Sequence, residues 1–230
     1  MTQVENHLIE LLPEASKNRL LALCEPVYLK LSDRLGEPDE ASTHVYFPVD
    51  AFVSLVALID GHPGLEVGMV GREGMVGAHW VLGVDHAPLR VLVQGPGRAW
   101  RIEAGRFVAE LAQSPKLQIT LNRFIYVLMA QMTRSATCLR FHLILPRLAR
   151  WLLMSQDRAH AGDFQVTHEF LAYMLGVRRV GVTQAAGHLQ RLGLIAYRRG
   201  HVTVLDRAGL EAIACSCFAK DRLIYATHMV

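Results

Sequence analysis

The sequence contains few cysteines. Only four of the 230 residues are cysteine, at positions 24, 138, 215 and 217. This small, scattered set excludes the dense disulfide framework that stabilises small secreted domains. Cys215 and Cys217 form a Cys-x-Cys pair, which alone is weak support for a metal site, and His228 is the histidine that could join it. We therefore interpret the thiols as structural or incidental, and expect no bound metal or cofactor.

Long apolar runs are also missing. Stretches such as 51–59 and 124–130 are much shorter than the ~20 residues that a bilayer-spanning helix needs. The first residues, MTQVENHLIELLPEAS, lack the basic region and apolar core of a secretory signal. We expect a cytoplasmic protein with no membrane partner. Because 51% of the residues are hydrophobic, the chain can bury one large core or two modest ones.

The net charge is small, +3, but it is unevenly distributed. Residues 1–139 hold 12 Lys and Arg against 15 Asp and Glu, whereas residues 140–230 hold 12 against 6. A basic C-terminal part beside an acidic N-terminal part favours contact between the former and a polyanion. A solvated basic surface is the alternative interpretation.

Patterning predicts an α+β protein. Short β-rich runs between residues 26 and 103 are separated by the turn sequences DGHPG, GREG and GPG, which indicates an antiparallel barrel or sandwich. A long helix is expected over 115–137, with Pro115 near its start. Steps of three and four residues give this helix an apolar seam of the coiled-coil type. The seam could cover the protein's own sheets, but residues 124–129 are apolar nearly all round, so we expect a second face to meet another copy. The predicted dimer residues are Leu117, Leu121, Phe124, Leu128 and Met132.

The region after residue 166 predicts a winged helix-turn-helix. Thr167 suits a helix N-cap, Gly176 a turn, and Gly193 the end of a second helix, after which LIAYRRGHVTVLD reads as a hairpin. The second helix of such a motif enters the DNA major groove. Its outward residues, predicted to read bases, are Arg178, Arg179, Thr183, Gln184 and His188. Residues predicted to contact the DNA backbone are Thr167, His168, Arg191, Arg198, Arg199 and His201. A helical hairpin with solvated arginines and a winged helix that binds protein are the alternatives.

These residues resemble the Crp/Fnr family of bacterial transcription regulators. The strongest similarity lies in residues 167–214, THEFLAYMLGVRRVGVTQAAGHLQRLGLIAYRRGHVTVLDRAGLEAIA, and HVYFPVDAFVSLV resembles the family's first sensor strands. The resemblance implies a β-roll sensor at 1–113, a dimerisation helix at 114–139 and a winged DNA-binding domain at 140–230. It also implies a homodimer on a pseudo-palindromic operator, with RNA polymerase as a further candidate partner.

Departures from the family pattern limit what is carried over. Arg179 matches the family's guanine-reading arginine, but Val180 stands in place of its glutamate and Gln184 in place of its second arginine, so we expect a different target sequence. The cyclic-nucleotide pocket is degenerate, since Ala78 cannot accept a ribose hydroxyl. The residues that we assign to this degenerate ligand pocket are Gly77, Ala78, His79 and Arg90. We expect an effector other than cyclic AMP.

Other chemistries are poorly supported. Only Cys24 lies near the N-terminus, which disfavours the N-terminal iron–sulfur site of one branch of the family, and lone sensor histidines are weak haem ligands. The sequence has no nucleophile elbow, HExxH, phosphate loop or carboxylate cluster, so we expect no enzyme. The alternative function is a cyclic-nucleotide-like binding module whose helix-turn-helix makes non-specific DNA or protein contacts.

Overall fold

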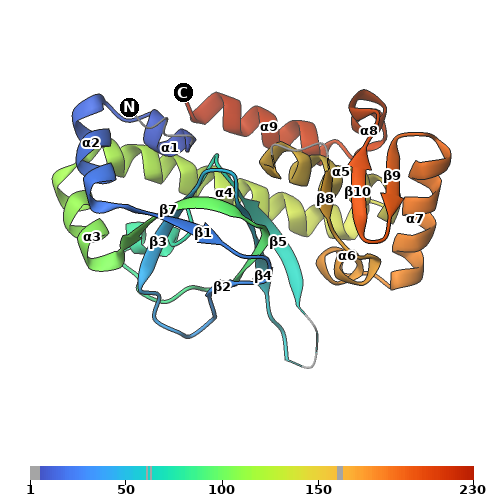
Figure 1. The fold of residues 1–230 in the computed structure, drawn as a ribbon, viewed down its shortest axis with the longest axis horizontal. Helices are drawn as coiled ribbons and strands as arrows, with labels where there is room; N and C mark the ends of the chain where they lie inside the picture. Colours follow the sequence, from blue (N-terminus) through green and yellow to red (C-terminus); the bar gives the residue numbers. More distant parts are fainter. Residues whose placement is uncertain (1–5, 61, 63, 160–162) are drawn as a thin grey trace.

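A sheet domain and a mainly helical domain lie side by side, and one long helix passes along both (Figure 1). The computed structural model describes residues 6–60, 62, 64–159 and 163–230. The long helix α4 (Pro115–Phe141) leads from the sheet domain to the helical domain, and α9 (Cys217–His228) returns against it. None of the described helices has a stretch long and apolar enough to cross a membrane.

Two antiparallel sheets, with strand orders β1-β7-β3 and β2-β6-β4-β5, form the first domain. The strands are β1 (Glu25–Leu29), β2 (Arg34–Gly36), β3 (His44–Pro48), β4 (Phe52–Ala57), β5 (Leu65–Val70), β6 (Arg90–Gly95) and β7 (Gly97–Glu103). The predicted β-roll type of sheet domain is therefore confirmed, including the hairpin of β4 and β5.

The central strand β4 is buried on both faces, which explains its mainly apolar sequence, interrupted only by Ser54. Val53 and Leu55 belong to the core of the sheet domain, whereas Phe52 and Val56 belong to the core of the helical domain. Alternate side chains of a strand point to opposite faces, so this strand joins the two cores. The domains consequently share a packed interface.

Short helices lie mainly at the end of the sheet domain that is away from the helical domain (Figure 1). They are α1 (His7–Glu10), α2 (Glu14–Leu23), the 3-10 turn η1 (Ala78–Leu82) and α3 (Ala104–Gln113). The predicted helix α4 is present and extends four residues beyond the expected end, to Phe141.

The apolar seam predicted for a dimer faces the protein's own core instead. Leu117, Leu121 and Phe124 are buried in the sheet-domain core, and Leu128 and Met132 pack against it. Leu117, Leu121 and Phe124 are therefore not available to a second copy, so their assignment to the dimer contact is wrong. Leu128 and Met132 are only partly buried, and their dimer contact stays a prediction. Helical periodicity identifies an apolar face but does not say what covers it.

The helical domain has the predicted winged helix-turn-helix order. Its elements before α9 are α5 (Ile144–Ala159), β8 (Asp163–Gln165), α6 (His168–Leu175), α7 (Arg179–Arg191), β9 (Ile195–Arg198), β10 (His201–Val204) and α8 (Arg207–Ile213). The three strands form a sheet of order β8-β10-β9. Helix α5 shares one buried core with the helices and strands that follow it, so it is part of this domain.

Candidate nucleic-acid interface

Local capping residues fix the helix-turn-helix. The Thr167 hydroxyl accepts a hydrogen bond from the Phe170 amide at 3.1 Å, which satisfies one of the free N–H groups at the start of α6. Gly176 ends α6 in the left-handed conformation at φ 59°, where a side chain would be strained. The turn therefore places α7 against α6 as the sequence predicts.

Helix α7 has one buried face and one exposed face. Val182, Ala185, Ala186 and Leu189 are buried in the domain core. The opposite face exposes all the predicted base-reading residues, which are Arg178, Arg179, Thr183, Gln184 and His188. The structure thus brings these five residues together on one solvent-facing surface, which we call the α7 face.

The N-terminus of α7 lacks the residues that usually stabilise a helix start. Arg178 occupies the N-cap position without a capping side-chain hydrogen bond, and the first turn has no acidic residue. Cations at this end oppose the helix dipole, which favours anions there by about 0.3–1 kcal/mol. An approaching phosphate would relieve both defects.

Two residues predicted to touch DNA contact each other. His168 Nδ1 lies 3.1 Å from Thr183 Oγ1, and the Thr183 hydroxyl also lies 3.1 Å from the Arg179 carbonyl oxygen, to which it donates. The His168 ring packs at 4.4 Å on that of Tyr197. Burial lowers the pKa of His168, and the Arg179 charge lowers it further. This imidazole therefore favours its neutral form, and its phosphate contact remains a prediction.

The wing is a tight hairpin beside the start of α6. Arg199 and Gly200 both have positive φ, 52° and 81°, as a two-residue hairpin turn requires. The Val166 amide donates to the Gly200 carbonyl at 2.7 Å, which brings the turn next to Thr167. The predicted backbone-contacting residues Arg191, Arg198, Arg199, His201 and Thr167 are exposed, and His168 is half-buried.

The residues of the predicted degenerate ligand pocket have partners within their own domain. Gly77 has φ 91° at the start of η1, where Ala78 begins the turn. His79 Nε2 lies 2.7 Å from Ser42 Oγ, and burial lowers the pKa of its imidazole. The Arg90 guanidinium instead donates to Glu37 at 2.9 Å. Arg90 is thus already neutralised by a carboxylate of its own domain.

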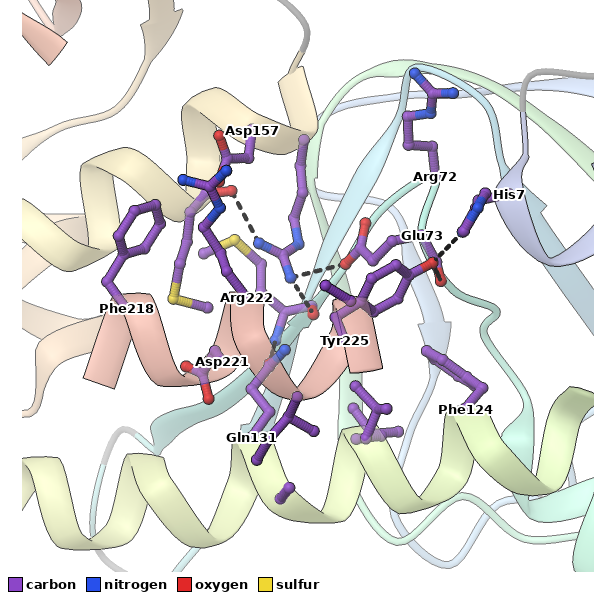
Figure 2. A pocket seen from close by; sticks show the side chains of 18 residues that line it. His7, Arg72, Glu73, Phe124, Gln131, Asp157, Phe218, Asp221, Arg222 and Tyr225 are labelled. Carbon is purple, nitrogen blue, oxygen red and sulfur yellow. Dashed lines mark hydrogen bonds and ion pairs between the residues drawn. The ribbon is translucent and has the colours of Figure 1, made fainter. Parts of the chain in front are cut away.

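A cavity of about 430 Å³ lies at the junction of the two domains (Figure 2). It is lined by α4, α5, α9 and the turn 71–74. Arg158 pairs with Glu73 at 2.7 Å, and the Tyr225 hydroxyl donates to the Glu73 carbonyl at 2.9 Å. The sequence indicated only a turn here, because Arg158 and Tyr225 are far away along the chain.

Comparisons with known proteins agree with this geometry. Residues 146–213 match the family model of the Crp-like helix-turn-helix domain. No curated protein gives a significant match to the sequence.

Similar solved structures cover nearly the whole fold. A transcriptional regulator of the crp/fnr family from Eubacterium rectale is 18% identical, with a TM-score of 0.69 over 91% of this chain and 99% of the other. The c-di-GMP-responsive regulator CLP of Xanthomonas campestris is 20% identical, with a TM-score of 0.67 over 84% of this chain and 99% of the other. FixK2 of Bradyrhizobium japonicum is 14% identical, with a TM-score of 0.68 over 84% of this chain and 98% of the other. The resemblance found in the sequence is thereby confirmed: residues 146–213 match the Crp-like helix-turn-helix domain, and the described chain has the fold of the Crp/Fnr transcription regulators.

Proposed function

We propose that this protein is a sequence-specific regulator of transcription that binds double-stranded DNA in the cytoplasm. The observation that carries the proposal is the α7 face, where every predicted base-reading side chain is exposed while Val182, Ala185, Ala186 and Leu189 on the opposite face are buried. Recognition helices present such a polar surface to the major groove.

The α7 face suggests which bases are read. Arg179 can donate two hydrogen bonds to guanine, and Gln184 can pair with adenine. Val180 is 60% exposed in the same turn of helix, where its apolar side chain suits a thymine methyl group. Arg199 in the wing and Thr167 at the start of α6 lie near each other and would contact the phosphate backbone.

Selection from random double-stranded DNA with the full chain tests the proposal. We expect enrichment of two inverted half-sites, centred one helical turn or about 34–36 Å apart. A Lys220→Ala variant, changed on α9, should select the same sequence. Weak binding without any enriched sequence would contradict the proposal and favour the alternative, a ligand-binding module with non-specific DNA contact.

We place the dimer contact on the exposed face of α4 rather than on its buried seam. Ile119, Tyr126, Met129 and Thr133 are exposed and follow one another at steps of 7, 3 and 4. This spacing forms a second stripe along α4, and two α4 helices that face each other in a dimer would bury it. Met129→Arg should convert a dimer to a monomer in sedimentation experiments, whereas Leu82→Arg, at a similarly exposed apolar residue of the sheet domain, should not. A dimer that survives Met129→Arg would contradict this contact.

We do not propose cyclic AMP as the effector. Ala78 offers no acceptor for a ribose, and Glu37 already neutralises Arg90, so a cyclic phosphate would lack a free cation there. Calorimetry of the full chain with cyclic AMP and cyclic GMP should show no binding. Saturable heat with either nucleotide would overturn this conclusion.

A further inference from the structure

Three thiols and one imidazole meet at the C-terminal end of α4. Cys138 lies in the last turn of this helix, and His142 is its C-cap. Cys215 lies between α8 and α9, and Cys217 is the first residue of α9. Although more than 70 residues separate the two pairs, one ligand atom of each of the four residues lies within 4.8 Å of all the others. We call this set the Cys3His cluster.

Three of the six distances within the Cys3His cluster are close to the edges of a coordination tetrahedron, and the other three are no longer than 4.8 Å. The Cys138 and Cys215 sulfurs are 3.5 Å apart, and His142 Nδ1 lies 3.4 Å from Cys138 Sγ and 3.6 Å from Cys217 Sγ. Zinc bonds of about 2.3 Å to sulfur and about 2.0–2.1 Å to nitrogen place tetrahedral ligand atoms roughly 3.5–3.8 Å apart. A disulfide would need its sulfurs about 2.05 Å apart.

Ordinary packing does not explain the cluster. A free cysteine usually behaves as a small apolar residue within a hydrophobic core. Cys24 does so, since it packs against the core of the sheet domain. The three buried thiols of the Cys3His cluster instead pack on one another, apart from both large cores. Their sulfurs converge on a common point together with a ring nitrogen, which is the arrangement of ligands around an ion.

The surrounding charges fit a metal thiolate centre. A divalent ion with three thiolates and a neutral imidazole carries one net negative charge. Arg147 and Arg150 are buried and line the same small cavity as Cys138. Positive side chains there would compensate the centre, because a buried charge without a partner is costly.

We propose that the Cys3His cluster binds one zinc ion, which fastens the beginning of α9 to the end of α4. Thiolates and imidazole in a tetrahedral set favour zinc, and four protein ligands make a closed site of the structural type. The ligand histidine is His142, whereas His228, considered from the sequence, packs against Tyr126 instead. The proposal replaces our expectation that the thiols bind no metal, and it does not depend on DNA binding.

The first test uses the full chain, purified under reducing conditions without added chelator. Elemental analysis should find about one zinc per chain, and Co²⁺ exchanged into the site should give the intense visible bands and sulfur-to-cobalt charge transfer of a tetrahedral thiolate site. No zinc and no such spectrum, in protein whose four thiols are free, would overturn the proposal. Iron with inorganic sulfide, or a Cys138–Cys215 disulfide in place of metal, would overturn it as well.

Matched variants locate the ion. Cys215→Ser and Cys217→Ser should each lose the stoichiometric zinc and the cobalt spectrum, whereas Cys24→Ser, which changes a thiol outside the cluster, should keep both. Retention of zinc and spectrum in both cluster variants would refute the assignment. If the cluster variants do not fold, the metal content and cobalt spectrum of the unmodified chain still decide the proposal.

Discussion

Two helices of the same domain use arginine in opposite ways. On α7, Arg178 and Arg179 are exposed, and neither forms an ion pair with any described residue. On α5, Arg150 and Arg158 are buried and paired with Asp221 and Glu73 at 2.8 and 2.7 Å. Exposed guanidinium groups suit binding of another molecule, whereas buried ones hold the domains together.

Because of this difference, the net charge of residues 140–230 overstates the positive surface that can meet a polyanion. The excess of basic residues in 140–230 includes Arg147, Arg150 and Arg158, which are buried and do not face an approaching polyanion. The positive surface is therefore narrower than the composition suggests, and its members on the α7 face and the wing are Arg178, Arg179, Arg198 and Arg199. The following predictions separate the two sets of arginines.

Removal of a buried arginine should have the largest effect. Arg150→Met leaves Asp221 paired only with Arg134 in a largely buried position and removes a contact to Ser135. We expect a loss of about 3–5 kcal/mol in the free energy of unfolding, measured with urea. Arg191→Met on the exposed surface of α7 should change it by less than about 0.5 kcal/mol. Equal stabilities would contradict the structural role of the buried set.

The carboxylate beside the buried arginines should give a pH-dependent stability. Burial raises the pKa of Glu66 from 4.5 to about 7, although a hydrogen bond from Ser54 and the charges of Arg150 and Arg158 oppose this. Because the folded pKa lies above the unfolded one, the stabilising contribution of protonated Glu66 is present below about pH 4.5 and is lost as the pH rises through 7.

Glu66→Gln should therefore stabilise the protein at pH 8, by up to about 3 kcal/mol, and change little near pH 4.5. Urea unfolding at both pH values measures this difference. The exposed Glu40→Gln variant is the control and should show no such dependence. A Glu66→Gln effect of the same size at both pH values would show that this carboxyl does not titrate as described.

Removal of an exposed arginine should change binding rather than stability. Arg179→Ala should weaken binding to the selected operator by about 1–3 kcal/mol and relax the preference at one base position. Selection from random DNA and affinity measurements at fixed salt concentration compare the variant with the unmodified chain. An unchanged base preference would remove Arg179 from the reading surface.

The smallest effect is expected in the wing. Arg199→Ala should weaken binding to all sequences alike and lower the slope of log affinity against log salt by about 1, since one phosphate contact is lost. The measurement is a salt titration with operator and with unrelated DNA. An unaltered slope would exclude the phosphate contact of Arg199.

Local signals made the winged domain predictable from the sequence. Thr167, Gly176 and the Arg199-Gly200 turn each fix a helix end or a turn through their own backbone and side chain. Two other features depend on which distant segments of the chain meet. Helical periodicity did not reveal that the sheet-domain core packs on the apolar seam of α4, and the Cys-x-Cys spacing did not reveal the Cys3His cluster.

The two glycines of α7 also have roles that the sequence alone does not distinguish. A Cβ at Gly181 would lie 2.7 Å from Ile144 Cδ1, so this glycine permits close packing of α7 on α5. At Gly187 the nearest heavy atom would be Arg191 Nη1 at 3.7 Å, an ordinary contact on a more open side. Both residues weaken a helix equally in isolation, by up to about 1 kcal/mol relative to Ala. Only the packed structure distinguishes their roles.

The position of α9 also constrains the order of folding. Tyr225 on this helix contacts His7 and Glu73, across 218 and 152 residues of chain, and Asp221 binds Arg150 across 71. Every element that α9 touches precedes it in the sequence, and contacts at such separations form slowly because long loops must close first. Each domain can collapse on its own local contacts before α9 docks across both. The junction between the sheet domain and the helical domain would thus be the last part of the molecule to become rigid.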